Sequence, residues 1–225
     1  MGAGGNKLFL PLQGIPILYY TLSQLNSLPA VTRIFPVIRE DEAGDLAAML
    51  EAHGALQKLM PPVWGGKERS DSVRNGLTRV LSDPGSPVVM VHDGARPFVD
   101  QAMLERLEKA AQAACALPVL PVADTTRQLD GPLELPTTGD QSTRVIDRGH
   151  LALTQTPQAF PVKWIEQVFF TDQAKRAQLT DEGSYFEAAG LPVVLVLGAK
   201  GNLKLTHPED LALAEALFSL QKNKE

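Results

Sequence analysis

The sequence predicts an α/β protein with a mostly parallel sheet and helices on both of its faces. Four short runs are almost continuously apolar, which is typical of strands that are buried on both sides. Stretches of ten or more residues with helical periodicity lie between them, and this alternation produces right-handed βαβ units with parallel pairing. With 225 residues, 44% of them hydrophobic and 21% charged, the chain has ordinary globular composition and is expected to form one domain, 1–225.

The elements follow one another in a regular order. The predicted strands are 34–38, 88–91, 117–122 and 193–197. The predicted helices are 16–28, 42–53, 70–81, 101–114 and 208–220. Pro16 and Pro208 suit a first helical turn, where the missing N–H is not needed, and Asp100 suits the N-cap position before Gln101.

One long segment, from Asp124 to about Ala152, departs from this order. It has no long apolar run, and Gly131 and Pro136 lie among the residues that would break a helix. Because 29 residues are too many for a plain loop, we expect a protruding arm at about 124–152. Its strands would be 127–129 and 143–146, paired as a hairpin. Such an arm can bury its apolar side chains against a second subunit, so we expect a dimerisation arm.

Composition and charge exclude several classes of protein. The net charge is −5, which argues against general binding of nucleic acid but allows a local basic cleft for phosphates. Cys115 has no partner for an intramolecular disulfide, and the four histidines show no metal-ligand spacing. No apolar run is long enough to span a membrane, and the start lacks a signal-peptide core. We therefore expect a cytoplasmic protein that binds neither membrane nor nucleic acid.

Polar residues that could bind a ligand follow the second predicted strand, in the segment Val91-His-Asp-Gly-Ala-Arg-Pro97. Ligands bind at the carboxyl edge of open α/β sheets. Asp93 could orient a ribose or hold a metal, Gly94 allows close approach to the backbone, and Arg96 offers a bidentate fork to a phosphate. The structural alternative is a tight turn in which Asp93 caps and Arg96 pairs on the surface.

Three further segments carry weaker signals. Lys7 follows a glycine-rich start, where a lysine can act as a movable charge near phosphate, although a solvated tail is an equal alternative. The segment 65–73 joins a glycine turn to a helix start, so it could read the edge of a base or could simply be a capped helix. Lys204 lies after the last predicted strand, where a solvated surface lysine is the simpler interpretation.

Taken together, these segments resemble the 2-C-methyl-D-erythritol 4-phosphate cytidylyltransferases of the non-mevalonate isoprenoid pathway. The motifs that carry the resemblance run from Met1 to about Leu217. They are Gly-Gly-x-x-Arg-x-x-Ser-Val, His92-Asp-Gly-Ala-Arg-Pro97, Gln155-Thr-Pro-Gln158, Thr-Asp-Glu and Asn202-Leu-Lys-Leu-Thr206 followed by His-Pro-Glu-Asp-Leu. The resemblance implies a Rossmann-like nucleotidyltransferase fold and a homodimer with exchanged arms.

The resemblance also implies a reaction and a role for each matching residue. A cytidylyl group passes from CTP to 2-C-methyl-D-erythritol 4-phosphate, releasing pyrophosphate with Mg2+ present, and 4-diphosphocytidyl-2-C-methyl-D-erythritol forms. Lys7, Arg148 and Lys204 match the catalytic cations, with Lys7 on the α-phosphate. The nucleotide-binding positions are Gly66, Lys67, Ser72, Asp93 and Gly94. The substrate phosphate would be held by Arg96, Thr125, Arg148 and Lys204, with Thr125 and Arg148 supplied by the partner subunit. No Mg2+ ligand is assigned.

The sequence departs from the family pattern at its start. The family begins with an interior strand and a longer glycine-rich loop, and this sequence contains only the later part of that pattern. An empty position inside a sheet would leave backbone groups of the neighbouring strands unpaired. We therefore expect about 15–25 further residues upstream in the cellular protein, the length of one strand and its loop.

Three other functions remain open from the sequence. A cytidylyltransferase of the same fold could act on ribitol 5-phosphate or another polyol phosphate. A catalytically impaired dimer partner would fit the short start. A metal-dependent glycosyltransferase is disfavoured, because no Asp-x-Asp follows a strand and Val91 stands two residues before Asp93.

Overall fold

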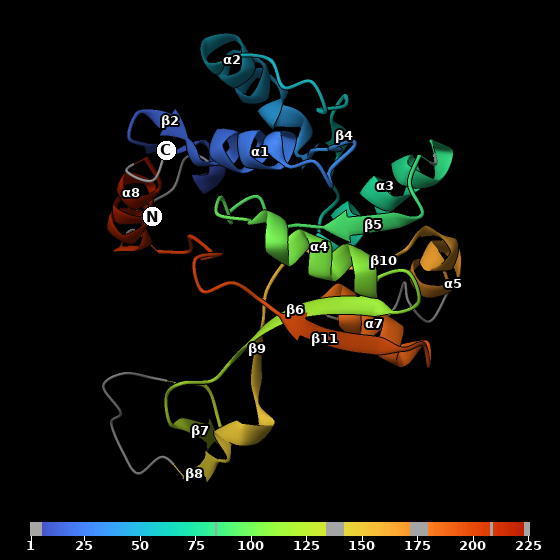
Figure 1. The fold of residues 1–225 in the computed structure, drawn as a ribbon, viewed down its shortest axis with the longest axis vertical. Coiled ribbons are helices and arrows are strands. Elements are labelled where there is room, and N and C mark those ends of the chain that lie inside the picture. The colour runs from blue at the N-terminus through green and yellow to red at the C-terminus, as the bar shows by residue number, and fades with distance from the viewer. Residues whose placement is uncertain (1–5, 84, 134–141, 172–179, 208, 223–225) are drawn as a thin grey trace.

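A central sheet organises the molecule in the computed structural model, which describes residues 6–83, 85–133, 142–171, 180–207 and 209–222. Its order is β11-β6-β10-β5, and β9 also pairs with β6 (Figure 1). The strands are β5 (Val88–Val91), β6 (Cys115–Pro121), β9 (Ala152–Thr154), β10 (Gln158–Pro161) and β11 (Val193–Leu197).

The sheet is mixed, so the prediction of a mostly parallel sheet is not confirmed. β11 pairs with β6 in parallel, whereas β10 lies antiparallel between β5 and β6 and β9 is antiparallel to β6. The sequence did not predict β10, because this strand has only four residues and begins inside the motif Gln155-Thr-Pro-Gln158. β5, β6 and β11 nevertheless run in one direction, so their carboxyl ends share one edge of the sheet.

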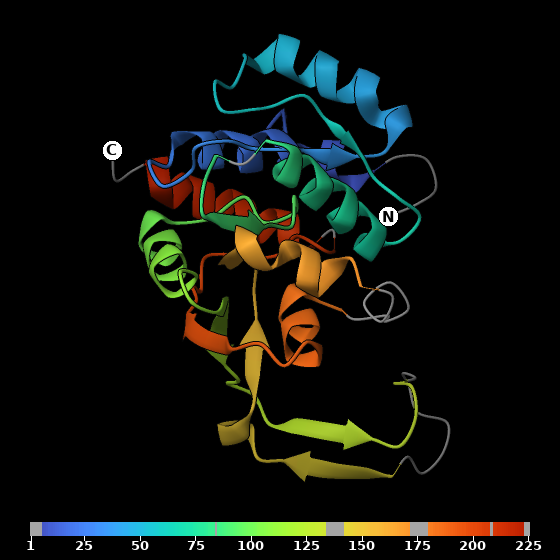
Figure 2. The ribbon, with the colours of Figure 1, turned by 90° about the vertical axis from the view of Figure 1, so that its right-hand side faces the viewer.

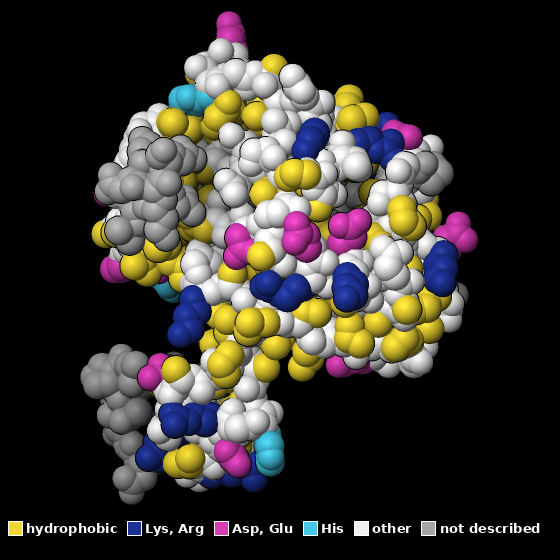
Figure 3. All heavy atoms as spheres, in the orientation of Figure 1, with side chains coloured by type: hydrophobic (Ala, Val, Ile, Leu, Met, Phe, Trp, Pro, Cys, Tyr) yellow, Lys and Arg dark blue, Asp and Glu magenta, His cyan; other side chains and the backbone are white. Residues whose placement is uncertain are grey.

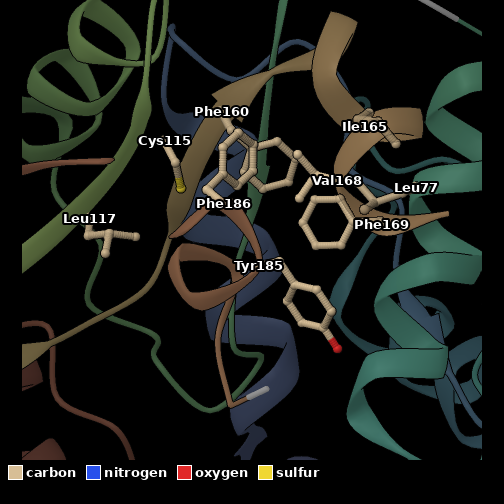
Figure 4. Close-up of a cluster of buried hydrophobic side chains, with 9 residues drawn as sticks. All are labelled: Leu77, Cys115, Leu117, Phe160, Ile165, Val168, Phe169, Tyr185 and Phe186. Carbon is tan, nitrogen blue, oxygen red and sulfur yellow. The ribbon is translucent and has the colours of Figure 1, made fainter. Parts of the chain in front are cut away.

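Helices cover both faces of this sheet, as predicted. On one face, α3 (Arg69–Ser82), α5 (Ile165–Phe169) and α7 (Glu182–Ala188) pack around a core in which Phe160, Phe169 and Phe186 meet (Figure 4). The ring centroids of Phe160 and Phe186 are 5.1 Å apart. On the other face, α4 (Gln101–Ala110) packs through Met103, Leu104 and Leu107. The sheet supplies alternate residues to the two cores, as the period of two in a strand requires.

The N-terminal part of the chain lies beside the sheet. The short hairpin β1 (Pro11–Leu12) and β2 (Ile15–Pro16) leads into α1 (Ile17–Ser27), with Pro16 at the N-cap. After α1 come β3 (Val37–Ile38), α2 (Ala43–His53) and β4 (Val63–Trp64), and β3 pairs with β4 in parallel. The last helix, α8 (Glu209–Lys222), returns to the same part of the molecule and packs Phe218 against Phe98 and Tyr20.

An apolar cavity of about 430 Å³ lies between β3 and β5. Its lining includes Ile34 and Ile38 on the β3 side, Val89 and Val91 of β5, and Leu22 of α1. β5 is the last strand of the central sheet, and within the part of the chain that the structure describes β3 pairs only with β4. The two sheets therefore face each other across this cavity without hydrogen-bonding to one another.

The predicted arm is present as a hairpin that projects away from the body (Figure 2). β7 (Thr126–Leu129) and β8 (Thr143–Ile146) pair antiparallel, from Thr126 with Ile146 to Leu129 with Thr143. The short 3-10 helix η3 (Arg148–His150) then leads through β9 back to the sheet. Pro136 and Gly139 of the predicted arm lie outside the described residues.

The other predicted elements differ from the structure mainly at their ends. Each of the five predicted helices is present, the largest difference being α4, which ends at Ala110 instead of residue 114. Asp100 caps α4 by accepting a hydrogen bond of 2.6 Å from the Met103 N–H, as predicted. The first predicted strand is reduced to β3 and an isolated bridge between Ile34 and Leu59. α5 and α7 were not predicted.

Candidate active site

The carboxylate of Asp93 is the centre of a charged cluster at the carboxyl edge of β5. The Lys204 Nζ lies 2.8 Å from Asp93 Oδ2, and Arg96 Nε lies 3.7 Å from the same oxygen. From α3, Arg69 Nη2 lies 3.9 Å from Asp93 Oδ1. The structure thus brings Lys204, which follows the last predicted strand, to Asp93 and Arg96, which both follow the second one.

These cations decide the protonation state of Asp93. Burial acts to raise the pKa of the Asp93 carboxyl, but the hydrogen bond from Lys204 and the charges of Lys204, Arg69 and Arg96 outweigh it. The net effect holds the pKa of Asp93 below its usual range. Asp93 is therefore ionised at neutral pH and available as a hydrogen-bond acceptor.

A network of buried and partly buried hydrogen bonds fixes the loop that carries Asp93 and Arg96. The Arg96 guanidinium donates through Nη1 to the carbonyl of Asn202 at 2.8 Å. The Asn202 side chain donates to the Thr156 carbonyl at 2.8 Å, and the Thr156 hydroxyl accepts from the Asp93 N–H at 3.0 Å. The loops after β5, β9 and β11 therefore position one another.

The segment Gly65–Ser72 folds tightly onto the start of α3. The Gly66 N–H donates to the Ser72 hydroxyl at 3.1 Å. A Cβ at Gly66 would lie 2.3 Å from Asp71 Cβ, so a side chain at this position would clash with α3. The Lys67 side chain next to this turn is exposed. Arg69 and Ser72 line the same cavity as Asp93 and Gly94, so the structure brings this segment close to the loop after β5.

Lys7 reaches the same neighbourhood through its short 3-10 helix, η1 (Lys7–Phe9). Asn6 caps η1 by accepting from the Leu8 N–H at 3.1 Å and donates to Glu42 Oε1 at 2.9 Å. The Leu8 side chain packs over Gly94, where an added Cβ would lie 3.2 Å from Leu8 Cδ1. The tight packing of Leu8 on Gly94 places η1 beside the Asp93 loop.

Thr125 and Arg148 lie elsewhere in the chain. Both are exposed on the arm, which Figures 1 and 2 show projecting away from the carboxyl edge of β5. Arg148 donates to the backbone carbonyl of Ala123, so it holds the two ends of the arm together. Within one subunit, the structure does not bring these two residues to the Asp93 cluster.

Two charged residues of the site were not assigned a role from the sequence, Arg69 and Glu182. Their side chains form a bidentate pair with distances of 2.8 and 3.2 Å. Burial acts to raise the pKa of Glu182, against the opposing effect of Arg69, and the net shift is upward. Both residues stand in motifs that carried the resemblance, Gly-Gly-x-x-Arg and Thr-Asp-Glu, and only the fold shows that they meet.

The described residues do not offer a protein-built metal site. They contain no group of three or more His, Cys, Asp or Glu side chains arranged to hold an ion. The two carboxylates nearest the cluster, Asp93 and Glu182, are both paired with cations. Also among the described residues, no helix is long and apolar enough to cross a membrane.

Comparisons with known proteins identify the family of the chain. The family model of the 2-C-methyl-D-erythritol 4-phosphate cytidylyltransferases matches residues 1–220. A protein of that name from Bacillus licheniformis is 36% identical over 227 residues, covering 100% of this chain and 93% of the relative. The corresponding protein from Syntrophus aciditrophicus is 33% identical, with coverage of 100% and 92%.

Solved structures show the same likeness. The crystal structure of 2-C-methyl-D-erythritol 4-phosphate cytidylyltransferase from Thermus thermophilus is 32% identical, with a TM-score of 0.72 and 96% of each chain covered. The 4-diphosphocytidyl-2C-methyl-D-erythritol synthase from Anaerococcus prevotii gives a TM-score of 0.79 at 26% identity, covering 97% of this chain and 92% of that one. The chain therefore belongs to the 2-C-methyl-D-erythritol 4-phosphate cytidylyltransferase family of nucleotidyltransferases.

Proposed function

We propose that the Asp93 cluster and the Gly65–Ser72 segment together form the site at which this chain transfers a cytidylyl group from CTP to 2-C-methyl-D-erythritol 4-phosphate. The observation that carries the proposal is the gathering of Lys204, Arg96 and Arg69 around one carboxylate at the strand edge. A phosphate oxygen of the acceptor attacks the α-phosphorus of CTP. The bond from that phosphorus to the β-phosphate breaks, and pyrophosphate leaves.

CTP would lie across the segment at the start of α3 and the loop after β5. The backbone of Gly66 and Lys67 and the hydroxyl of Ser72 read the cytosine, and Asp93 with Gly94 holds the ribose. The ionised state of Asp93 supports this role, because a carboxylate accepts hydrogen bonds from ribose hydroxyls. Lys7, at the start of the short helix beside Gly94, neutralises the charge that develops on the α-phosphate.

The acceptor phosphate needs several cations, because it approaches an already anionic nucleotide. Lys204 and Arg96 come from the body, and Arg148 and Thr125 come from the arm of a partner subunit. This chemistry requires no covalent protein intermediate, so the protein contributes positioning and charge neutralisation. The distance between arm and cluster within one subunit supports a site shared by two chains (Figure 1).

Exposed apolar side chains support the homodimer. Leu195 and Leu197 of β11 are 61% and 63% exposed, and Leu153 of β9 is 56% exposed. Figure 3 shows hydrophobic side chains gathered where the sheet meets the arm. A second copy of the chain, arm included, would cover these residues.

Mg2+ would enter with the nucleotide, since the described residues contain no group of three or more His, Cys, Asp or Glu side chains that could hold the ion without it. The phosphate oxygens of CTP are the hard ligands that Mg2+ prefers. A cytoplasmic location is supported by the single cysteine, Cys115, which is buried and has no intramolecular disulfide partner.

Pyrophosphate release from CTP tests the proposal. We expect release to require 2-C-methyl-D-erythritol 4-phosphate and to be at least about tenfold slower with ribitol 5-phosphate, because acceptor contacts position the attacking oxygen. The product should carry one cytidylyl group per pyrophosphate released. Equal rates with the two acceptors would assign the chain to general polyol phosphate transfer, and no release with either would refute the proposal.

A further inference from the structure

Arg69 and Glu182 form a bidentate ion pair beside the Asp93 cluster, and the proposed function gives this pair no role. The Glu182 side chain is 1% exposed, whereas that of Arg69 is 43% exposed. Both oxygens of Glu182 accept from the Arg69 guanidinium, at 2.8 and 3.2 Å. A buried bidentate pair of this kind fixes the plane of the guanidinium as well as its position.

Glu182 is itself held rigidly by the sheet. It is the first residue of α7, whose N-cap Asp181 accepts from the Ser184 N–H at 3.0 Å. Gln158 of β10 donates to Asp181 at 3.0 Å and accepts from the Gly183 N–H at 3.0 Å. The start of α7 is thus fastened to β10, and the carboxylate of Glu182 has a defined position relative to the cluster.

Arg69 has two carboxylates within reach. Its Nη2 lies 3.2 Å from Glu182 Oε2 and 3.9 Å from Asp93 Oδ1. Arg69 is also the first residue of α3, where the helix dipole disfavours a cation and a compensating anion is needed. Without the charge of Glu182, the guanidinium would therefore move onto Asp93, the nearest remaining carboxylate.

We propose that Glu182 is a positioning residue: it holds Arg69 beside Asp93 and prevents Arg69 from moving into hydrogen-bond distance of that carboxylate. The arrangement leaves Asp93 free for Lys204 and for the ribose of CTP, and it fixes the start of α3 next to the nucleotide. This inference rests on the proposed role of Asp93 in binding CTP.

The first test is Glu182→Gln, which keeps the shape of the side chain and removes its charge. We expect kcat/KM for CTP to fall about 10- to 100-fold, because small displacements of positioning groups cost that much. The KM for the acceptor should change less than about threefold, because Arg96 and Lys204 keep their own contacts. Glu187→Gln is the matched control, since Glu187 lies exposed on the same helix.

A double-substitution cycle separates positioning from general structural support. If Glu182 acts through Arg69, adding Glu182→Gln to Arg69→Met should lower kcat/KM for CTP by less than about twofold, or should raise it. The proposal would be overturned if the losses in kcat/KM of the two single variants multiplied in the double variant. It would also be overturned if Glu182→Gln raised the KM values of CTP and of the acceptor equally. Thermal unfolding of each variant shows whether the comparison is between folded proteins.

Two further variants provide a replacement for Glu182→Gln and a separate test of the nucleotide site. Should Glu182→Gln fail to fold, Arg69→Lys replaces it, because a lysine keeps the charge but not the bidentate geometry, and the same selective loss for CTP is expected. Asp93→Asn tests the underlying site separately. An unchanged KM for CTP in Asp93→Asn would refute the proposed nucleotide site. A raised KM in that variant, combined with independent effects of Glu182→Gln and Arg69→Met, would refute only the role of Glu182.

Discussion

The Lys204 side chain pairs with Asp93 and remains partly exposed. Its Nζ lies 2.8 Å from Asp93, and the side chain is 44% exposed, so Lys204 can contact a second anion. We expect Lys204→Met to lower kcat by about 10²–10³-fold, the usual cost of removing one group that stabilises developing negative charge. Steady-state rates of pyrophosphate release measure this. Lys200→Met, at an exposed lysine nearby in sequence, should leave the rate within about twofold, and an equal loss in both variants would contradict the assignment.

His92 gives the site a predicted dependence of stability on pH. Burial lowers its pKa from 6.5 to about 4, and its ring nitrogens contact the Arg96 carbonyl at 3.0 Å and the Thr156 hydroxyl at 3.1 Å. The charges of Asp93 and Arg96 have smaller, opposite effects. Between pH 6.5 and about pH 4, the unfolded chain binds a proton at His92 that the native chain does not bind. The free energy of unfolding therefore falls as pH falls through this range.

Denaturant unfolding at several pH values measures this effect. The free energy of unfolding should fall by roughly 2–3 kcal/mol from pH 7 to pH 4 on account of His92, following its pKa shift. Other groups also titrate in this range, so the informative comparison is with His92→Gln, which has no ionisable ring. An equally steep decline in His92→Gln would show that folding does not lower the pKa of His92.

Single residues also mark the limit of inference from the sequence. The place of Asp93 and Lys204 at one edge of the sheet was predictable because both follow apolar strands, and strand ends of one direction meet at one edge. The ion pair between them was not, since the residues alone favoured a solvated Lys204. The pairing of Arg69 with Glu182 was not predictable either, because 113 residues separate them and α7, which carries Glu182, was not predicted. Short helices with few turns give too little periodicity to be recognised.

At the scale of elements, β10 determines how the sheet is assembled. It joins β5 to β6 and places Phe160, which is fully buried, against Phe169 and Phe186 at centroid distances of 5.3 and 5.1 Å. We expect Phe160→Ala to lower the free energy of unfolding by about 3–5 kcal/mol, through lost burial and a residual cavity. Leu213→Ala on α8, where the side chain is 51% exposed, should change it by less than about 0.5 kcal/mol. Similar losses in denaturant titrations of the two variants would contradict this packing.

The cavity between β3 and β5 separates two parts of the molecule for which we expect different local stability. β6 is hydrogen-bonded on both sides, whereas β3 and β4 have two residues each, and β3 lines a cavity of about 430 Å³. We expect amide hydrogens of β6 and β10 to exchange at least about 100-fold more slowly than those of β3 and β4, because β3 and β4 pair over only two residues and belong to no larger sheet among the described residues. Hydrogen exchange followed by peptide mass analysis measures the difference. Uniform protection of all four strands would contradict it.

On the scale of the whole molecule, the body and the arm carry different parts of the proposed site. The hairpin of the arm was predictable within one residue, since its strands are bounded by turn residues. Where the arm points was not, because its direction depends on contacts of β9 with β6 that lie outside the hairpin. Thr125 and Arg148 therefore complete the site only if another subunit presents them, which makes assembly part of the proposed mechanism.

Mixed dimers of two inactive variants test this arrangement. Lys204→Met removes a group of the body and Arg148→Ala removes one of the arm, so each variant alone should lose at least about 100-fold in rate. If each site joins the body of one subunit to the arm of the other, a mixed dimer has one site with both substitutions and one with neither. After unfolding and refolding in equal amounts, half of the dimers are mixed, so about a quarter of the wild-type activity should return. Sites built within one subunit would instead give no recovery, because each would keep its own substitution, and refolded wild-type protein sets the reference for complete recovery.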